Sequence, residues 1–166
     1  MQVNIALLTV TDTRTIGTDK SGAILVKKIK EQNHKLIDRK LVKDEKEEIK
    51  KILLNWIKKD DLDVIITTGG TGLTGRDITP EAIKDIADKE IPGFGELFRE
   101  LSYKTIGTSA MQSRACAVLA NGKYIFALPG SPGGVTDAWD GILKYQLDIN
   151  YKPCNFVELF PRLKEK

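Results

Sequence analysis

The chain has 166 residues, of which 41% are hydrophobic and 30% are charged, and its formal net charge is +3 at pH 7. This balance is typical of one globular domain, which we place at residues 1–166, and it excludes a disordered chain. Acidic and basic residues are mixed without a long block of one sign, so the charge does not indicate a nucleic-acid partner.

Short apolar runs alternate with helical patterns in the first half of the chain. The apolar runs at 5–11, 35–42 and 63–68 are predicted strands, and the segments 21–32 and 45–58 are predicted helices. In the second helix the apolar side chains recur three and four residues apart, which places them on one face. This alternation is typical of βαβ units, so we expect a largely parallel sheet.

The second half begins with two predicted helices. Thr79 and Pro80 combine an N-cap with a proline in the first turn, so a helix is expected from there to Lys89. The segment 91–93 contains proline and glycine and should end that helix. A second, short helix is predicted at 96–103.

A hairpin and a last helix follow. The apolar runs at 115–120 and 124–128 flank Asn121-Gly122, a dipeptide typical of hairpin turns. An antiparallel hairpin added to parallel units predicts a mixed, mostly parallel sheet. The expected fold class is therefore α/β, with a final amphipathic helix near 135–143.

The most informative stretch is TTGGTGLTGRDITPEA, residues 67–82, where a predicted strand enters a glycine-rich turn that ends at a helix start. Backbone N–H groups and the helix dipole can converge there on an anion such as a phosphate. The alternative is a long turn in which the glycines only allow the fold, but four glycines in seven residues exceed what a turn needs. The candidate phosphate-binding residues are Thr68, Gly69, Gly70, Thr71, Gly72 and Gly75.

Residues 70–75, GTGLTG, formally match the dinucleotide-binding pattern G-x-G-x-x-G. In that pattern the helix begins within the glycine turn, whereas here the helix start signals come several residues later. The segment also follows the third predicted strand instead of the first. A dinucleotide-dependent oxidoreductase is therefore the weakest functional interpretation.

Two aspartates are candidate catalytic residues and magnesium ligands. Asp77 lies between the glycine turn and the next helix, where a magnesium ion would mediate between its carboxylate and a bound phosphate. Alternatively, Asp77 is an Asx-type cap or pairs with Arg76. Asp44 follows the second predicted strand and fits a helix N-cap. Because parallel strands end at one edge of a sheet, Asp44 and Asp77 can also face one crevice.

Two further segments are candidate ligand contacts. The loop LPGSPGG follows a strand and precedes a helix, and it offers Pro129, Gly130 and Ser131, although a purely structural turn explains it equally well. Ser113 and Arg114 form a candidate anion clamp, with a surface salt bridge as the alternative for the arginine.

The number and spacing of the cysteines and histidines limit which metal sites and which redox compartment are plausible. Cys116 and Cys154 lie far apart and His34 is the only histidine, which argues against a zinc site of the usual Cys/His kind. We expect reduced thiols in the cytoplasm. No window approaches the roughly 18 apolar residues of a membrane span, so we expect a soluble protein without a membrane partner.

The motifs TTGGTG with GRDITPEA, then PGFGELFRELSYKTIGTSAMQSRA, then LPGSPGG, resemble the MoaB/MogA family of molybdenum cofactor biosynthesis proteins. The resemblance runs from about residue 5 to the tail, and IGTSAMQSRA and QLDINYKPCNF are closer to its B branch than to its G branch. It implies a three-layer α/β/α sandwich that assembles into trimers, or into hexamers of two trimers. The candidate interface residues are aromatic, with the monomer core as the alternative: Phe94, Phe98, Phe156 and Phe160.

The resemblance also implies a chemistry. Members of the G branch and some archaeal B-branch proteins adenylylate molybdopterin with Mg-ATP before molybdate or tungstate is inserted. The two essential carboxylates of the family match Asp44 in LVKDE and Asp77 in GRDITPEA, and some B-branch members that carry glutamate at the first position are inactive. We therefore expect a molybdopterin adenylyltransferase that uses Mg²⁺ and ATP.

A non-catalytic molybdopterin-binding or carrier protein of the same pathway is the alternative function. One departure from the family pattern bears on the pterin contacts. Where many members have Ser-Asp-Arg after the first strand, this chain has Thr11-Asp12-Thr13-Arg14. The pterin-side contact in this segment is therefore left open.

Overall fold

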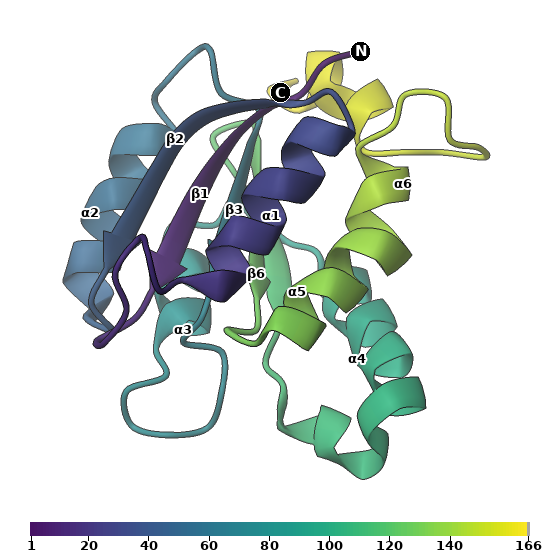
Figure 1. Cartoon of the computed structure of the whole chain (residues 1–166). Helices are drawn as coiled ribbons and strands as arrows, with labels where there is room; N and C mark the ends of the chain where they lie inside the picture. Colours follow the sequence, from purple (N-terminus) through teal and green to yellow (C-terminus); the bar gives the residue numbers. More distant parts are fainter. Residues whose placement is uncertain (166) are drawn as a thin grey trace.

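A computed structural model describes residues 1–165 and shows a three-layer α/β/α fold around one mixed sheet (Figure 1). The sheet has six strands in the order β2-β1-β3-β6-β5-β4. The neighbours β2, β1, β3 and β6 pair in parallel. At the other side of the sheet, β5 pairs antiparallel with β6, and β4 pairs antiparallel with β5. The strands are β1 (Asn4–Val10), β2 (Lys35–Val42), β3 (Val64–Thr68), β4 (Lys89–Glu90), β5 (Cys116–Ala120) and β6 (Lys123–Leu128).

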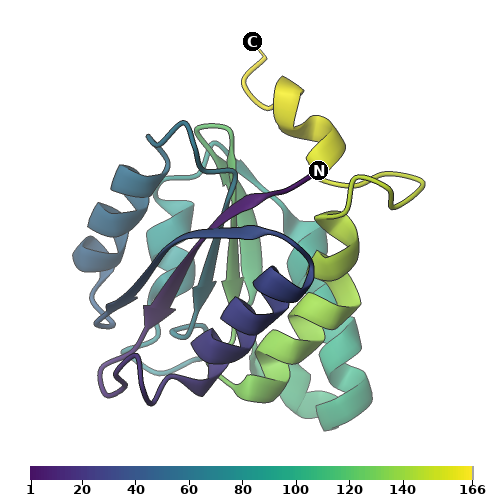
Figure 2. The same ribbon diagram turned by 45° about the horizontal axis from the view of Figure 1, so that its top comes forward.

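Helices cover both faces of the sheet, with α1, α4 and α5 on one face and α2 and α3 on the other (Figures 1 and 2). The α-helices are α1 (Lys20–Glu31), α2 (Lys46–Trp56), α3 (Thr79–Lys84), α4 (Pro92–Ile106), α5 (Pro132–Ala138) and α6 (Lys144–Gln146). Between and after them lie the 3-10 helix η1 (Gly107–Gln112), the π-helical turn η2 (Trp139–Leu143) and the 3-10 helix η3 (Val157–Arg162). Within residues 1–165, each helix is too short or too polar to cross a bilayer.

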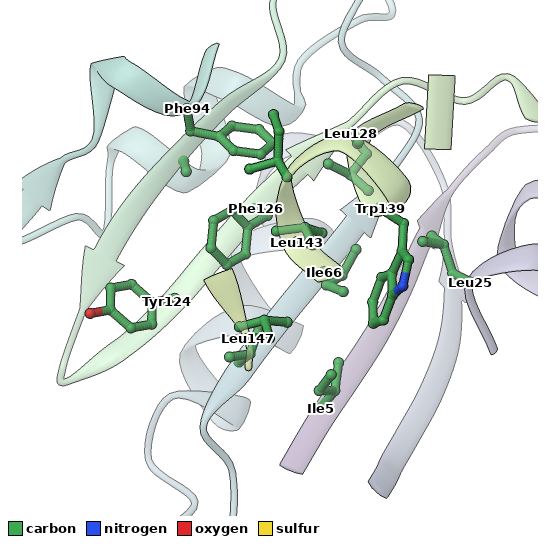
Figure 3. Close-up of a cluster of buried hydrophobic side chains, with 14 of the residues drawn as sticks. Ile5, Leu25, Ile66, Phe94, Tyr124, Phe126, Leu128, Trp139, Leu143 and Leu147 are labelled. Atoms are coloured by element: carbon green, nitrogen blue, oxygen red, sulfur yellow. The ribbon is translucent and has the colours of Figure 1, made fainter. Parts of the chain in front are cut away.

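The two-sided covering explains why the central strands are largely apolar. In β1, Ile5 and Leu7 enter one core cluster and Ala6 and Leu8 enter the other. Successive side chains of a strand point to opposite faces, so a strand covered on both faces needs an unbroken apolar run. Figure 3 shows the first cluster, in which the Trp139 side chain fills the space between α1 and the sheet.

The structure corrects the expected helices around residue 90. The helix predicted to reach Lys89 ends at Lys84, and β4 follows because the chain pairs with the free edge of β5. The next helix starts at Pro92 and not at 96, since proline fits the first turn of a helix. Proline therefore opens α4 after β4 instead of only ending a helix.

The aromatic residues proposed for an interface are largely in the core. Phe94 and Phe98 are 4% and 1% exposed and pack in the first core cluster, so the alternative interpretation is right for both. Phe156 and Phe160 are partly buried against the same cluster and contact Tyr124. Exposed apolar residues lie elsewhere, and those on α4 and η1 are Leu97, Tyr103, Ile106 and Met111.

Candidate functional site

The two predicted loops meet at the carboxyl ends of β3 and β6. These strands are parallel neighbours, and Thr68 is in register with Leu128, so both loops leave the sheet at the same edge. The Thr68 hydroxyl donates to the Pro129 carbonyl oxygen at 2.7 Å, and the Gly69 N–H donates to the Leu128 oxygen at 3.0 Å. The glycine loop and the LPGSPGG loop therefore form one continuous surface.

Glycine is required at the start of the glycine loop. Gly69 and Gly70 have φ values of +99° and +68°, the left-handed region that side chains disfavour. A Cβ at Gly69 would collide with the Val10 carbonyl oxygen, and one at Gly70 would collide with the Thr79 hydroxyl. That hydroxyl is not a helix cap as predicted, because it donates across the loop to the Gly69 oxygen at 2.9 Å, and Ile78 occupies the N-cap position of α3.

A cavity of about 560 Å³ opens between these loops, α4, η1 and α5. Most of the predicted binding residues line it. They are Gly69, Gly70, Thr71, Gly72, Asp77, Ser113, Pro129, Gly130 and Ser131. Asp44, Thr68 and Gly75 lie outside this lining; Thr68 is buried beneath the loop, and Gly75 is exposed at its tip.

The opposite wall of the cavity was missed in the sequence. Phe98, Ser102, Thr105 and Ile106 line it from α4, and Asp137 lines it from α5. The Thr105 hydroxyl contacts an Asp137 carboxylate oxygen at 3.4 Å, and none of the ion pairs among residues 1–165 involves Asp137. The four wall residues of α4 are three to four positions apart, or adjacent, in the sequence, but no motif there distinguishes a cavity wall from an ordinary helix surface.

Asp77 is held inside the glycine loop. Its Oδ2 atom accepts hydrogen bonds from the Thr74 N–H at 2.8 Å and from the Thr74 hydroxyl at 2.7 Å. Burial alone would raise the pKa of Asp77, but the hydrogen bonds from Thr74 outweigh it and lower the pKa, so the carboxylate is ionised. The predicted alternatives are wrong: Asp77 does not cap α3, and Arg76 pairs with Asp12 and Glu45 instead.

Asp44 lies just beyond β2 and faces the same loop. A Cβ at Gly70 would lie 3.3 Å from its Oδ1 atom. The predicted capping role is not observed, because α2 starts at Lys46 after Glu45 without a side-chain cap among the described residues. Burial raises the pKa of Asp44, and the nearby charge of Asp12 raises it further. Asp44 is thus a carboxylate in an environment short of positive charge.

The donor set at this point fits a magnesium ion. Asp44 lies beside the loop at Gly70 and Asp77 lies beside it at Gly72, and the charge of Asp77 also raises the pKa of Asp44. Magnesium is usually bound by one or two carboxylates plus phosphates and waters. Within residues 1–165, no group of three or more His, Cys, Asp or Glu side chains is arranged to hold a metal. A cation here would therefore need phosphate oxygens as well.

Arg114 does not line the cavity. Its Nε atom donates to the main-chain carbonyl oxygen of Gly72 at 2.7 Å, and its Nη2 atom donates to the main-chain carbonyl oxygen of Asp77 at 2.8 Å. Its Nη1 atom donates to the carboxylate of Glu81. These contacts include a salt bridge with Glu81, which is the alternative proposed for Arg114. Of the two residues in the predicted anion clamp, only Ser113 lines the cavity.

Ser131 has a structural role in the second loop. Its hydroxyl accepts the Gly134 N–H at 3.1 Å and so caps α5, which begins at Pro132. The Gly130 carbonyl oxygen accepts from the Ser21 hydroxyl of α1 at 2.8 Å. The loop is thus built as a turn, and its contact with a ligand stays a prediction.

The fold and the site together define an α/β/α protein with a glycine-loop cavity at the carboxyl ends of parallel strands. Residues 6–148 match the sequence model of a family described as a probable molybdopterin binding domain. The chain belongs to this family of molybdenum cofactor biosynthesis proteins, which confirms the predicted resemblance.

Two bacterial relatives support this membership. The chain is 45% identical over 161 residues to molybdenum cofactor biosynthesis protein B of Escherichia coli K12, covering 97% of this chain and 93% of that one. It is 46% identical over 147 residues to the protein of the same name from Bacillus cereus, covering 88% and 87%.

Solved structures share the fold. A crystal structure of a molybdenum cofactor biosynthesis protein B matches with a TM-score of 0.89 at 41% identity, over 100% of this chain and 98% of that one. The tungsten cofactor synthesizing protein MoaB from Pyrococcus furiosus matches with a TM-score of 0.78 at 36% identity, over 86% and 91%. The predicted three-layer α/β/α class is therefore confirmed.

Proposed function

We propose that the protein is a molybdopterin adenylyltransferase, which transfers the adenylyl group of ATP to the terminal phosphate of molybdopterin before molybdate or tungstate insertion. The observation that carries the proposal is the pair of carboxylates, Asp44 and Asp77, that faces one glycine loop beside a cavity of about 560 Å³. A cavity of this size is in the range of small-molecule sites.

The reaction needs alignment and charge neutralisation more than proton transfer. An oxygen of the pterin phosphate attacks the α-phosphorus of ATP, the new P–O bond forms, and the bond to the β-phosphate breaks to release pyrophosphate. The glycine loop can present backbone N–H groups to the phosphates, and Asp44 and Asp77 would hold Mg²⁺. When bound, the ion would neutralise the phosphate oxygens and polarise the α-phosphate.

The far wall of the cavity suits the pterin ring. Ile106 offers apolar surface to a flat ring, and Asp137 offers a carboxylate. The aminopyrimidinone edge of a pterin presents two adjacent N–H donors, which a carboxylate accepts in bidentate fashion, whereas adenine lacks this pair of donors. We therefore assign the wall of α4 and α5 to the pterin and the glycine loop to the phosphates.

The partners in this proposal are molybdopterin, ATP and further copies of the chain, in the cytoplasm. Tyr103 and Met111 are 60% and 79% exposed on α4 and η1, which supports an interface between copies at this corner. Cys116 and Cys154 are free thiols, the state that a reducing compartment maintains. Burial raises the pKa of Cys116 to about 11, so this thiol stays protonated and unreactive near neutral pH.

Pyrophosphate release tests the proposal. Protein, Mg-ATP and molybdopterin are mixed, and pyrophosphate is measured with a coupled assay. We expect release that needs all three components. Molybdopterin binding without any release would instead identify the non-catalytic binding or carrier protein, and tight NAD binding would revive the oxidoreductase interpretation.

A further inference from the structure

We propose that Arg114 is a positioning residue, whose guanidinium, oriented by Glu81, sets the spacing between the two ends of the loop segment that carries Asp77. The importance of that spacing for turnover rests on the proposed adenylyltransferase function. The contacts themselves do not depend on it.

The guanidinium bridges two carbonyl groups of the glycine loop. Nε donates to the oxygen of Gly72, where the exposed tip of the loop begins, and Nη2 donates to the oxygen of Asp77, where it ends. The Arg114 backbone N–H adds a bond to the Thr71 oxygen at 2.9 Å. Because the guanidinium is planar and rigid, these bonds fix the separation of the two carbonyls, which the single ammonium of lysine cannot do.

Glu81 fixes the plane of that guanidinium from the first turn of α3. Its Oε1 atom accepts from Nη1 of Arg114, and its Oε2 atom is buried without a partner among residues 1–165. All the described side-chain hydrogen bonding of Glu81 therefore goes to Arg114. The pair ties the segment after η1 to α3, with the glycine loop held between them.

Besides Arg114, the loop tip is held chiefly by the exposed side chain of Arg76. Residues 73–76 are exposed, and Leu73 is 68% exposed, so no buried side chain anchors the tip. Arg76 makes two hydrogen bonds to the Asp12 carboxylate and one to Glu45, but these exposed contacts do not reach the Gly72 or Asp77 main chain.

The bonds between Thr74 and Asp77 close a small turn but do not attach it to the rest of the protein. The Asp77 N–H donates to the Thr74 oxygen at 3.0 Å, and the Asp77 carboxylate accepts from Thr74 in return. Two other contacts limit the movement of this turn: the Thr79 N–H donates to the Gly70 oxygen at 3.0 Å, and Arg76 bonds Asp12. Neither contact holds the Gly72 and Asp77 carbonyls at a fixed separation, so without Arg114 the Asp77 carboxylate could shift relative to Asp44. The distance between the two carboxylates, on which a shared ion depends, would then no longer be set.

The test compares two arginine-to-lysine variants. Arg114→Lys removes the bridge, and Arg99→Lys is the matched control, since Arg99 donates to the oxygens of Ser113 and Ala115 in the same segment but not to the glycine loop. We expect Arg114→Lys to lower kcat about 10- to 100-fold with the KM for molybdopterin unchanged. In calorimetry without pterin, it should raise the Mg²⁺ concentration needed for half-maximal ATP binding.

A double-mutant cycle separates positioning from general stability. If Arg114 acts through Asp77, the effect of Arg114→Lys on kcat should largely vanish in an Asp77→Asn background. Glu81→Gln, which leaves the arginine in place, should shift the Mg²⁺ requirement in the same direction to a smaller extent, and it carries the test if Arg114→Lys does not fold.

The outcomes distinguish this inference from the proposed function. Unchanged kcat and Mg²⁺ requirement in Arg114→Lys, or an undiminished effect in the Asp77→Asn background, would overturn the positioning role alone. Mg²⁺-dependent ATP binding that Arg114→Lys weakens, without pyrophosphate release from the unaltered protein, would support the positioning role and overturn the proposed function. No Mg²⁺-dependent ATP binding by the unaltered protein would overturn both.

Discussion

The surrounding residues shift the pKa values of the two site carboxylates in opposite directions. Asp77 has hydrogen bonds from Thr74 that lower its pKa despite partial burial. Asp44 has a raised pKa, because burial and the neighbouring carboxylate of Asp12 both oppose its ionisation, and Arg76 offsets them only in part. Asp77 is thus preorganised as an anion, and Asp44 has the most to gain from a bound cation.

Removing one site charge tests the assignment of the two carboxylates. Asp77→Asn keeps the size of the side chain but removes its negative charge, so turnover should fall at least ~100-fold while the fold and pterin binding persist. Asp44→Asn should act alike, and the two changes should not be additive if both residues hold one ion.

Asp85→Asn is the matched control, because Asp85 pairs with Lys46 on the surface outside the cavity. Pyrophosphate release and melting temperature are measured for each variant. Full activity in Asp77→Asn with an unchanged melting temperature would show that the metal is assigned to the wrong carboxylate.

Asp19 is a buried carboxylate that couples the stability of the fold to pH. It is 1% exposed and accepts bonds from the Thr9 hydroxyl at 2.6 Å, the Gly22 N–H at 2.9 Å and Arg39 at 3.0 Å. Burial alone would raise its pKa, but these bonds lower it below the ordinary value of 3.8. The ionised form therefore stabilises the fold above the unfolded pKa, and this contribution is lost as the pH falls through the folded pKa.

The Asp19 network predicts a stability loss at acid pH. Asp19→Asn should lower the free energy of unfolding near pH 7 by about 1 to 3 kcal/mol and should flatten its dependence on pH below about pH 4. Urea unfolding across this range measures both effects. An unaltered pH dependence in Asp19→Asn would mean that other carboxyl groups dominate acid unfolding.

The element that carries the site is the unit formed by β3, the glycine loop and α3. The loop leaves β3 with two residues of positive φ, and the Thr79 hydroxyl at the start of α3 returns to bond Gly69. The loop is thus closed at its base by a helix of only six residues. Its geometry depends on glycine more than on the helix.

Two glycine-to-alanine variants in this element test whether glycine is required at position 70. Gly70→Ala adds a Cβ at positive φ against Thr79 and should destabilise the fold by about 1 to 3 kcal/mol. Gly75→Ala is the control, because its added Cβ meets no atom within 4 Å, and its effect should stay within about 0.5 kcal/mol. Equal stability of the two variants in urea unfolding would contradict the requirement for glycine at 70.

For the whole molecule, the exposed apolar corner of α4 and η1 predicts self-association. Light scattering at micromolar protein should give a multiple of the 18.5 kDa chain mass. Met111→Glu should reduce that mass by burying a charge in the interface. Leu54→Glu, a change on α2 on the opposite face of the sheet, is the control and should leave it unaltered. A monomer mass for the unaltered protein would contradict the proposed oligomer.

The sequence by itself determined the βαβ pattern, the glycine loop and the two aspartates. These features depend on short-range physics: apolar periodicity identifies strands and helices, and positive φ at Gly69 and Gly70 requires glycine. All five predicted strands begin and end within one residue of the observed β1, β2, β3, β5 and β6, and only the short β4 was not predicted. Asp44 and Asp77 could be placed near one another because parallel strands end at one edge.

Only the tertiary structure decided which side chains meet. Arg114 bonds Gly72 from 42 residues away, and Arg76 reaches Asp12 across 64 residues instead of its neighbour Asp77. In the same way, β4 forms because the edge of β5 is free to pair, and α4 and Asp137 close the cavity from distant parts of the chain. Side-chain pairing and cavity lining depend on how the layers pack, and local periodicity carries no information about that packing.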